Sequence, residues 1–222
     1  MKSLVLFDIG RVLVTLDFSQ FYTRLSRVSS LAPAIVEQRL TGTGYMQTLD
    51  SGRDDLYRAT VRRALELDSK VSDAYLDSAY LSLHTGPNTD VVDLKARVMQ
   101  TTAVGLLSNS HRMVRSHIED RWPGTLRVNG PSAFSDKLQT LKPYQGIYES
   151  IASTAERIVF IDDLPENLVY PATMLRWHCI RYSALLPDAP VPPQLRTMSQ
   201  YQEAHDAATL EQCMRKAGIV LT

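Results

Sequence analysis

Short runs of apolar or β-branched residues recur along this chain, and polar or charged residues follow several of them directly. The runs span residues 3–7, 103–107, 132–134, 157–161 and 177–182. From residue 103 onward, helix-like patterns such as 112–121 and 145–155 separate them. Continuous apolar strands that alternate with helices are typical of a parallel sheet covered on both faces. We therefore predict an α/β fold with a Rossmann-like parallel sheet.

The stretch between the first two runs interrupts this rhythm. From about Asp17 to Thr85 there is no convincing strand pattern, but helical patterns occur at 18–27, 32–40, 54–67 and 71–82. A crossover between two strands needs far fewer residues than this stretch contains. We therefore predict a core built from residues 1–16 and 86–222, with residues 17–85 forming an inserted helical cap.

Charge and cysteine content narrow the class of protein. Lys and Arg together number 24, as do Asp and Glu, so the net charge is zero. This balance argues against nucleic acid or a membrane surface as the main partner. Cys179 and Cys213 have no metal-ligand spacing, and the first apolar run is too short for a secretion signal. We expect a cytoplasmic monomer or homodimer that acts on a small molecule.

Polar residues at the ends of the predicted strands are the candidate functional residues. Ligands of open parallel sheets bind beyond the carboxyl ends of the strands, so residues placed there can converge on one site. Six residues follow the runs in this way: Asp8, Ser108, Asn109, Lys142, Asp162 and Asp163.

Each of these residues has a structural alternative when it is considered alone. Ser108 or Asn109 can cap the helix that begins near His111, and Asp163 can cap the helix that follows it. Lys142 can be an ordinary solvated lysine. The combination is harder to explain structurally, because three carboxylates in one crevice repel one another unless cations share the site. Oxygen ligands with a net negative charge suit Mg²⁺, and the added lysine would suit a phosphoryl group.

Four motifs resemble a known family. The segments "FDIGRVLV", "LLSNS", "LKP" and "FIDDLPEN" are similar, in order and spacing, to the four signature motifs of the haloacid dehalogenase (HAD)-like hydrolase superfamily. The helical insert resembles the C1-type cap of that superfamily. The likeness spans about Ser3 to Tyr182, and the four motifs are specific only when taken together.

The resemblance implies a role for the residues that would bind and attack a phosphoryl group. Asp8 would be the nucleophile and form an aspartyl-phosphate. Ser108 and Asn109 would bind phosphate oxygens, and Lys142 would bridge Asp8 and the phosphate.

The resemblance also implies a Mg²⁺ site. Asp8 and the backbone carbonyl of Gly10 would be ligands. Asp163 would bind the ion directly, and Asp162 would assist through water or as a second ligand.

Gly10 departs from the pattern of most phosphatases in the superfamily. They carry a second aspartate two positions after the nucleophile, which serves as general acid and base. Positioned acid–base catalysis contributes about 10²–10⁴-fold, or roughly 3–5 kcal/mol, so its loss affects poor leaving groups most. Members with the same Asp-x-Gly opening include sugar-1-phosphate phosphatases. We therefore expect a Mg²⁺-dependent phosphatase of small phosphorylated metabolites, with sugar 1-phosphates as the leading substrate class.

Two alternatives remain open. The first is a metal-independent 2-haloacid dehalogenase-type hydrolase, in which the aspartate attacks carbon. The pair Asp162 and Asp163 disfavours it, because additional negative charge would hinder attack on an anionic haloacid. The second is a catalytically weak binding protein of the same fold. The reason to consider it is Gly10, which stands where an acid–base aspartate is expected.

Overall fold

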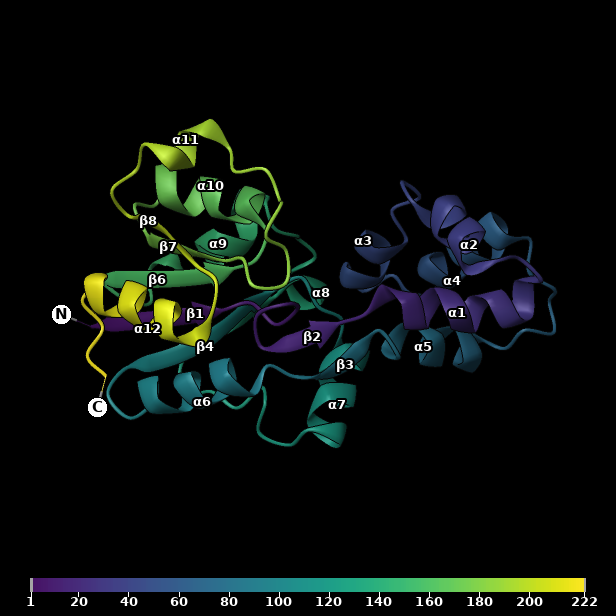
Figure 1. Cartoon of the computed structure of the whole chain (residues 1–222), viewed down its shortest axis with the longest axis horizontal. Helices are drawn as coiled ribbons and strands as arrows, with labels where there is room; N and C mark the ends of the chain where they lie inside the picture. Colours follow the sequence, from purple (N-terminus) through teal and green to yellow (C-terminus); the bar gives the residue numbers. More distant parts are fainter. Residues whose placement is uncertain (1, 222) are drawn as a thin grey trace.

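The computed structural model describes residues 2–221 and has a six-stranded parallel sheet at its centre (Figure 1). The strands lie in the order β5-β4-β1-β6-β7-β8, and each neighbouring pair is parallel. Their bounds are β1 Ser3–Phe7, β4 Ala103–Ser108, β5 Ala133–Phe134, β6 Arg157–Asp162, β7 His178–Tyr182 and β8 Tyr201–Ala204. The predicted α/β fold with a Rossmann-like parallel sheet is confirmed.

The strands are apolar throughout because both faces of the sheet are covered. In β1, Val5 and Phe7 belong to one buried cluster, while Leu4 and Leu6 belong to the other. Successive side chains of a strand point to opposite faces, which explains this alternation. The helices of the core divide accordingly between the two clusters: α6 Thr89–Val98, α7 Arg112–Arg121 and α12 Ala207–Lys216 on the first, α9 Gln145–Ala152, α10 Pro165–Thr173 and α11 Pro193–Arg196 on the second.

A group of helices from the first half of the chain lies to one side of the sheet (Figure 1). Its members are α1 Phe18–Ser29, α2 Pro33–Leu40, α3 Tyr45–Asp50, α4 Asp54–Leu65 and α5 Asp73–Leu81, and we call them the inserted helices. Two short antiparallel strands, β2 Val14–Leu16 and β3 His84–Pro87, join them to the rest of the chain. The first buried cluster continues from the sheet through Leu13 and Leu83 into this group, so the two regions share apolar packing.

Several short elements were not predicted from the sequence. Strands β2 and β3 mark the two crossings between the inserted helices and the core, and α3 has only six residues. The edge strand β8 was also missed, because its sequence YQEA lacks an apolar run. None of the helices that the structure describes between residues 2 and 221 combines the length and the hydropathy needed to cross a membrane.

Candidate active site

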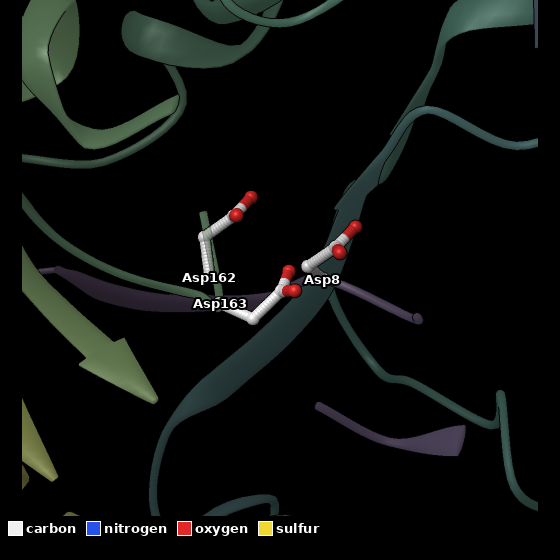
Figure 2. Close-up of side chains that lie close together, drawn as sticks. All are labelled: Asp8, Asp162 and Asp163. Atoms are coloured by element: carbon white, nitrogen blue, oxygen red, sulfur yellow. The ribbon is translucent and has the colours of Figure 1, made fainter. Parts of the chain in front are cut away.

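Three aspartates meet at the carboxyl end of the central strands (Figure 2). Asp8 follows β1, Asp162 ends β6 and Asp163 comes next. Parallel pairing aligns Phe7 with Ile161, and the Asp8 N–H donates to the Ile161 carbonyl at 2.9 Å. One ligand atom from each carboxylate lies within 4.8 Å of the others. The strand register therefore brings together residues that are more than 150 positions apart in the sequence.

Lys142 lies among these carboxylates and is itself buried. Its Nζ donates to Asp8 Oδ1 at 2.8 Å, to Asp162 Oδ2 at 2.5 Å and to the Leu107 carbonyl at 3.1 Å. An ammonium group has three donors, so these bonds use all of them. Burial alone would lower the pKa of Lys142, but the carboxylates of Asp162 and Asp8 more than offset that effect and raise it. The lysine is therefore a fixed positive charge.

The two aspartates after β6 have different surroundings. Asp162 is fully buried, and its Oδ1 accepts from the Leu164 N–H at 2.9 Å and from Asn167 Nδ2 at 3.0 Å. The Asp163 side chain has one partner among residues 2–221, Arg11 Nη1, which is 3.3 Å from its Oδ2. Burial raises the pKa of both carboxyls, since it penalises their charged forms. A divalent cation would relieve that penalty, so an oxygen-only set of this kind fits Mg²⁺.

Ser108 and Asn109 lie at the end of β4, beside the carboxylates. The Asn109 side chain is bonded in both directions to the backbone of Lys142. Its Oδ1 accepts from the Lys142 N–H at 2.7 Å, and its Nδ2 donates to the Lys142 carbonyl at 3.0 Å. This contact holds the lysine's loop against β4. Both Ser108 and Asn109 also line a cavity at the site.

The structure excludes the capping alternatives for these residues. His111 is the residue that caps α7, with its Nδ1 accepting from the Met113 N–H at 3.3 Å. Helix α10 begins after Leu164 without a side-chain cap, so Asp163 does not serve as one. Ser108, Asn109 and Asp163 are thus free of the helix-capping roles that their positions in the sequence allowed.

The cavity beside Asp8 is small, with a volume of about 80 Å³. The loops after β1 and β4 line it together with parts of the inserted helices. Gly10, Ser108, Asn109 and Ser110 contribute from the core, and Met46, Asp50 and Tyr80 contribute from the inserted helices. Ligand pockets commonly measure about 300–1,000 Å³, so this arrangement is nearly closed.

Gly10 adjoins the side chain of Leu16. A Cβ added at Gly10 would lie 3.3 Å from Leu16 Cδ1, so a larger residue would require a small shift of that side chain. Leu16 also lines the cavity. The position that carries an acid in most phosphatases of the superfamily therefore carries no polar side chain here.

No residue of helix α3 was predicted from the sequence to belong to the site. In the structure Tyr45 stacks on Phe21 in the interior, with ring centroids 5.7 Å apart, and Gln47 is exposed. Met46 and Asp50 line the cavity instead. No residue pattern could have distinguished them, because α3 is too short to show a periodic face.

Comparisons with known proteins place this geometry in context. No protein-family model and no curated protein matches the chain. Solved structures do match. HAD family enzyme BT-2542 from Bacteroides thetaiotaomicron has a TM-score of 0.67 at 20% identity, over 82% of this chain and 93% of its own. The chain has the HAD-like fold.

Two further HAD-fold structures extend the comparison. A predicted HAD-like family hydrolase from Porphyromonas gingivalis matches with a TM-score of 0.64 at 24% identity, over 81% of this chain and 89% of its own. The L-2-haloacid dehalogenase from Xanthobacter autotrophicus matches with a TM-score of 0.63 at 15% identity, over 97% of this chain and 99% of its own. The resemblance seen in the four motifs is thus confirmed at the level of the fold, which hosts more than one chemistry.

Proposed function

We propose that this protein is a Mg²⁺-dependent phosphatase that hydrolyses small phosphorylated metabolites through an aspartyl-phosphate on Asp8. The observation that carries the proposal is the convergence of Asp8, Asp162 and Asp163, with ligand atoms within 4.8 Å of one another. BT-2542, which shares the fold, has been solved in complex with magnesium and inorganic phosphate, and this supports the choice of metal and of substrate group.

The residues of the site would divide the work as follows. Asp8 has one oxygen held by Lys142, and its other carboxylate oxygen accepts no hydrogen bond from residues 2–221. That second oxygen is available to attack phosphorus. On substrate binding, Lys142 would exchange one of its three present acceptors for a phosphoryl oxygen, and the Ser108 hydroxyl would hold another. Asn109 keeps the lysine's loop in place and lends its amide to the same subsite.

The metal would be held by oxygen atoms alone. Asp8, Asp163 and the Gly10 carbonyl are the proposed ligands, and Asp162 assists through water or as a further ligand. Asp162 is the carboxylate most fully engaged with protein donors, which suits the assisting role. When bound, Mg²⁺ would neutralise negative charge on the carboxylates and on the phosphoryl oxygens.

The proposed substrates are phosphates whose leaving groups depart readily. The absence of an acid at Gly10 favours anomeric, acyl or aryl phosphates, and sugar 1-phosphates are the leading class. The cavity of about 80 Å³ implies that the inserted helices move to admit a sugar.

Release of inorganic phosphate from a panel of anomeric, acyl and aryl phosphates tests the proposal. We expect release that requires Mg²⁺, stops with a chelator and falls by roughly 10⁴–10⁶-fold in Asp8→Asn, since the nucleophile is lost. Halide release from 2-haloacids without metal would instead support the dehalogenase chemistry of the Xanthobacter structure. Binding of Mg²⁺ or phosphate without any turnover would support a binding protein.

A further inference from the structure

The proposed reaction lacks a proton donor on the core, and the inserted helices place a carboxyl group at the same cavity. Asp50 is the last residue of α3. It lines the cavity together with Gly10, Ser108 and Asn109. We propose that Asp50 is the general acid and base of this site, replacing the aspartate that is absent at Gly10, so that esters with poor leaving groups are hydrolysed in addition to the readily leaving classes. The assignment rests on the phosphatase function proposed above.

The backbone of Asp50 is tied to the core by a chain of hydrogen bonds. The Ser135 hydroxyl, from α8 Ser135–Leu138, donates to the Asp50 carbonyl at 2.6 Å. The same hydroxyl oxygen accepts from the Ser110 N–H at 3.0 Å. Next to it, Gln139 Nε2 donates to the Ser51 carbonyl at 3.0 Å. The end of α3 is therefore positioned by the loop that follows β4, next to the proposed phosphate subsite.

Two polar side chains at this cavity have no hydrogen-bond partner in the part of the chain that the structure describes. The Asp50 carboxyl makes no hydrogen bond with any of residues 2–221, although the residue is partly buried. Ser110 is 3% exposed, and its hydroxyl likewise has no partner in the described chain. Buried polar groups are nearly always paired, so the unpaired Ser110 hydroxyl indicates that a ligand binds at this cavity, beside the partly exposed Asp50 carboxyl. The leaving-group oxygen of a phosphate ester is such a ligand.

The electrostatic surroundings suit an acid. Burial raises the pKa of Asp50 well above its usual range, and the nearby Asp8 carboxylate adds to the shift. Lys142 and Arg115 oppose it without reversing it. A carboxyl with a raised pKa holds its proton more readily, and this suits the role of a general acid.

The other groups near the site are engaged elsewhere. His111 Nε2 lies 2.8 Å from Asp54 Oδ1, and its Nδ1 caps α7. His111 is also absent from the cavity lining, and the Asn109 amide is bonded to the backbone of Lys142.

His84 also lines the cavity, but its Nδ1 lies 3.2 Å from the Leu81 carbonyl, and burial lowers its pKa to about 4, so its ring stays neutral near pH 7. Asp50 is therefore the carboxyl group that this cavity offers as a proton donor.

The proposed steps balance as follows. As an Asp8 oxygen bonds to phosphorus, the bond from phosphorus to the leaving oxygen breaks, its electron pair stays on that oxygen, and the Asp50 proton moves to it. The Asp50 carboxylate then takes a proton from water as the water oxygen attacks phosphorus. The bond between Asp8 and phosphorus breaks, and inorganic phosphate leaves. Both aspartates return to their starting states. Because Asp50 belongs to the inserted helices, the acid is in place only when these helices lie against the core.

The test compares two small substrates that differ in leaving group. Acetyl phosphate releases acetate readily, whereas ethyl phosphate must release ethoxide and needs the acid. We expect Asp50→Asn to lower kcat/KM on ethyl phosphate by about 10²–10⁴-fold and on acetyl phosphate by less than about tenfold. The aspartyl-phosphate should also accumulate in Asp50→Asn with acetyl phosphate, because the base for the second step is missing. Asp55→Asn, an exposed position in the next helix, is the matched control and should retain the wild-type ratio of the two rates.

Both rates are measured on the same protein sample. A loss of folded protein therefore lowers both equally and leaves their ratio unchanged. An unchanged ratio in Asp50→Asn, in a wild-type protein that hydrolyses both compounds with Mg²⁺, would overturn the role of Asp50 alone. Release by the wild type from acetyl phosphate but not from ethyl phosphate would show that no acid assists the leaving group, and it would overturn the role of Asp50 alone. Absence of release from these two compounds and from the whole panel of phosphates would overturn the proposed function, and the role of Asp50 with it.

Discussion

The sheet and the inserted helices reach the candidate site in different ways. Backbone pairing between β1 and β6 holds Asp8 beside Asp162, and Lys142 bonds to both. The inserted helices reach the same place through side-chain contacts with the core, such as the bond from the Ser135 hydroxyl to the Asp50 carbonyl. The phosphate-binding side is therefore fixed by the fold itself. The leaving-group side depends on how the inserted helices are positioned against the core.

Removal of the lysine is the most severe way to disturb the fixed side. In Lys142→Met, we expect turnover to fall by about 10²–10³-fold, the typical effect of losing one donor to developing charge. The buried carboxylates would also lose their partner, which destabilises the fold by about 3–5 kcal/mol. Phosphate release and urea unfolding measure the two effects.

Lys137→Met provides the control for this substitution, because Lys137 is exposed in the same stretch of chain. Its free energy of unfolding should stay within about 0.5 kcal/mol of the wild type. Mg²⁺ should stabilise Lys142→Met more than it stabilises the wild type, since it would replace the missing charge. Equal stabilisation would argue against a metal among these carboxylates.

Glycine substitutions compare the packing of the sheet with that of the connecting strands. A Cβ at Gly105, in β4, would lie only 1.8 Å from the Pro131 carbonyl oxygen. We expect Gly105→Ala to destabilise the protein by about 3 kcal/mol or more, because backbone must move. Gly86 lies in β3, and the nearest atom to its added Cβ is 4.0 Å away. Gly86→Ala should change the unfolding free energy by less than about 1 kcal/mol. Equal losses in thermal or urea unfolding would show that the two regions are packed alike.

Acid should weaken the connection between the two regions. His84, at the start of β3, is buried, and burial lowers its pKa to about 4. The unfolded chain therefore binds a proton at this histidine more readily than the folded protein does. Its contribution to stability is complete above the usual histidine pKa of 6.5 and is lost as the pH falls towards 4.

The expected loss attributable to His84 is up to about 3 kcal/mol over that interval. Urea unfolding of the wild type and of His84→Phe at pH 7.5 and pH 5 measures it. The variant keeps an aromatic ring but has no titrating group, so its stability should fall less on acidification. An identical fall in both proteins would show that protonation of His84 does not oppose folding.

The site residues at the strand ends could be predicted from the sequence, and the reason is physical. Long-range placement in a parallel sheet follows from strand order, and apolar runs ending in Asp8, Ser108 or Asp162 identify both the strand and its functional end. The strand 3–7 has the predicted bounds, and the strands at 103 and 157 each extend by one residue to include the polar side chain. Roles for these residues remain proposals.

The contribution of the inserted helices could not be predicted. Helix α3 spans only Tyr45–Asp50, and its orientation depends on a hydroxyl of Ser135, which is 85 residues away in the sequence. Arg11 shows the same limitation. Its side chain pairs with Asp163, which is 152 positions away in the sequence. Such contacts arise from tertiary packing, and neither periodicity nor motif spacing encodes them.

Mass spectrometry of acid-quenched protein tests the role of Asp8 most directly. The protein is mixed with acetyl phosphate and Mg²⁺, quenched within the first turnover and digested. We expect one phosphoryl group on the peptide that contains Asp8, absent when a chelator is present and absent from Asp8→Asn. Phosphate release by the wild type with no phosphoryl group on that peptide, or with one on a different residue, would contradict the assignment of Asp8 as the nucleophile.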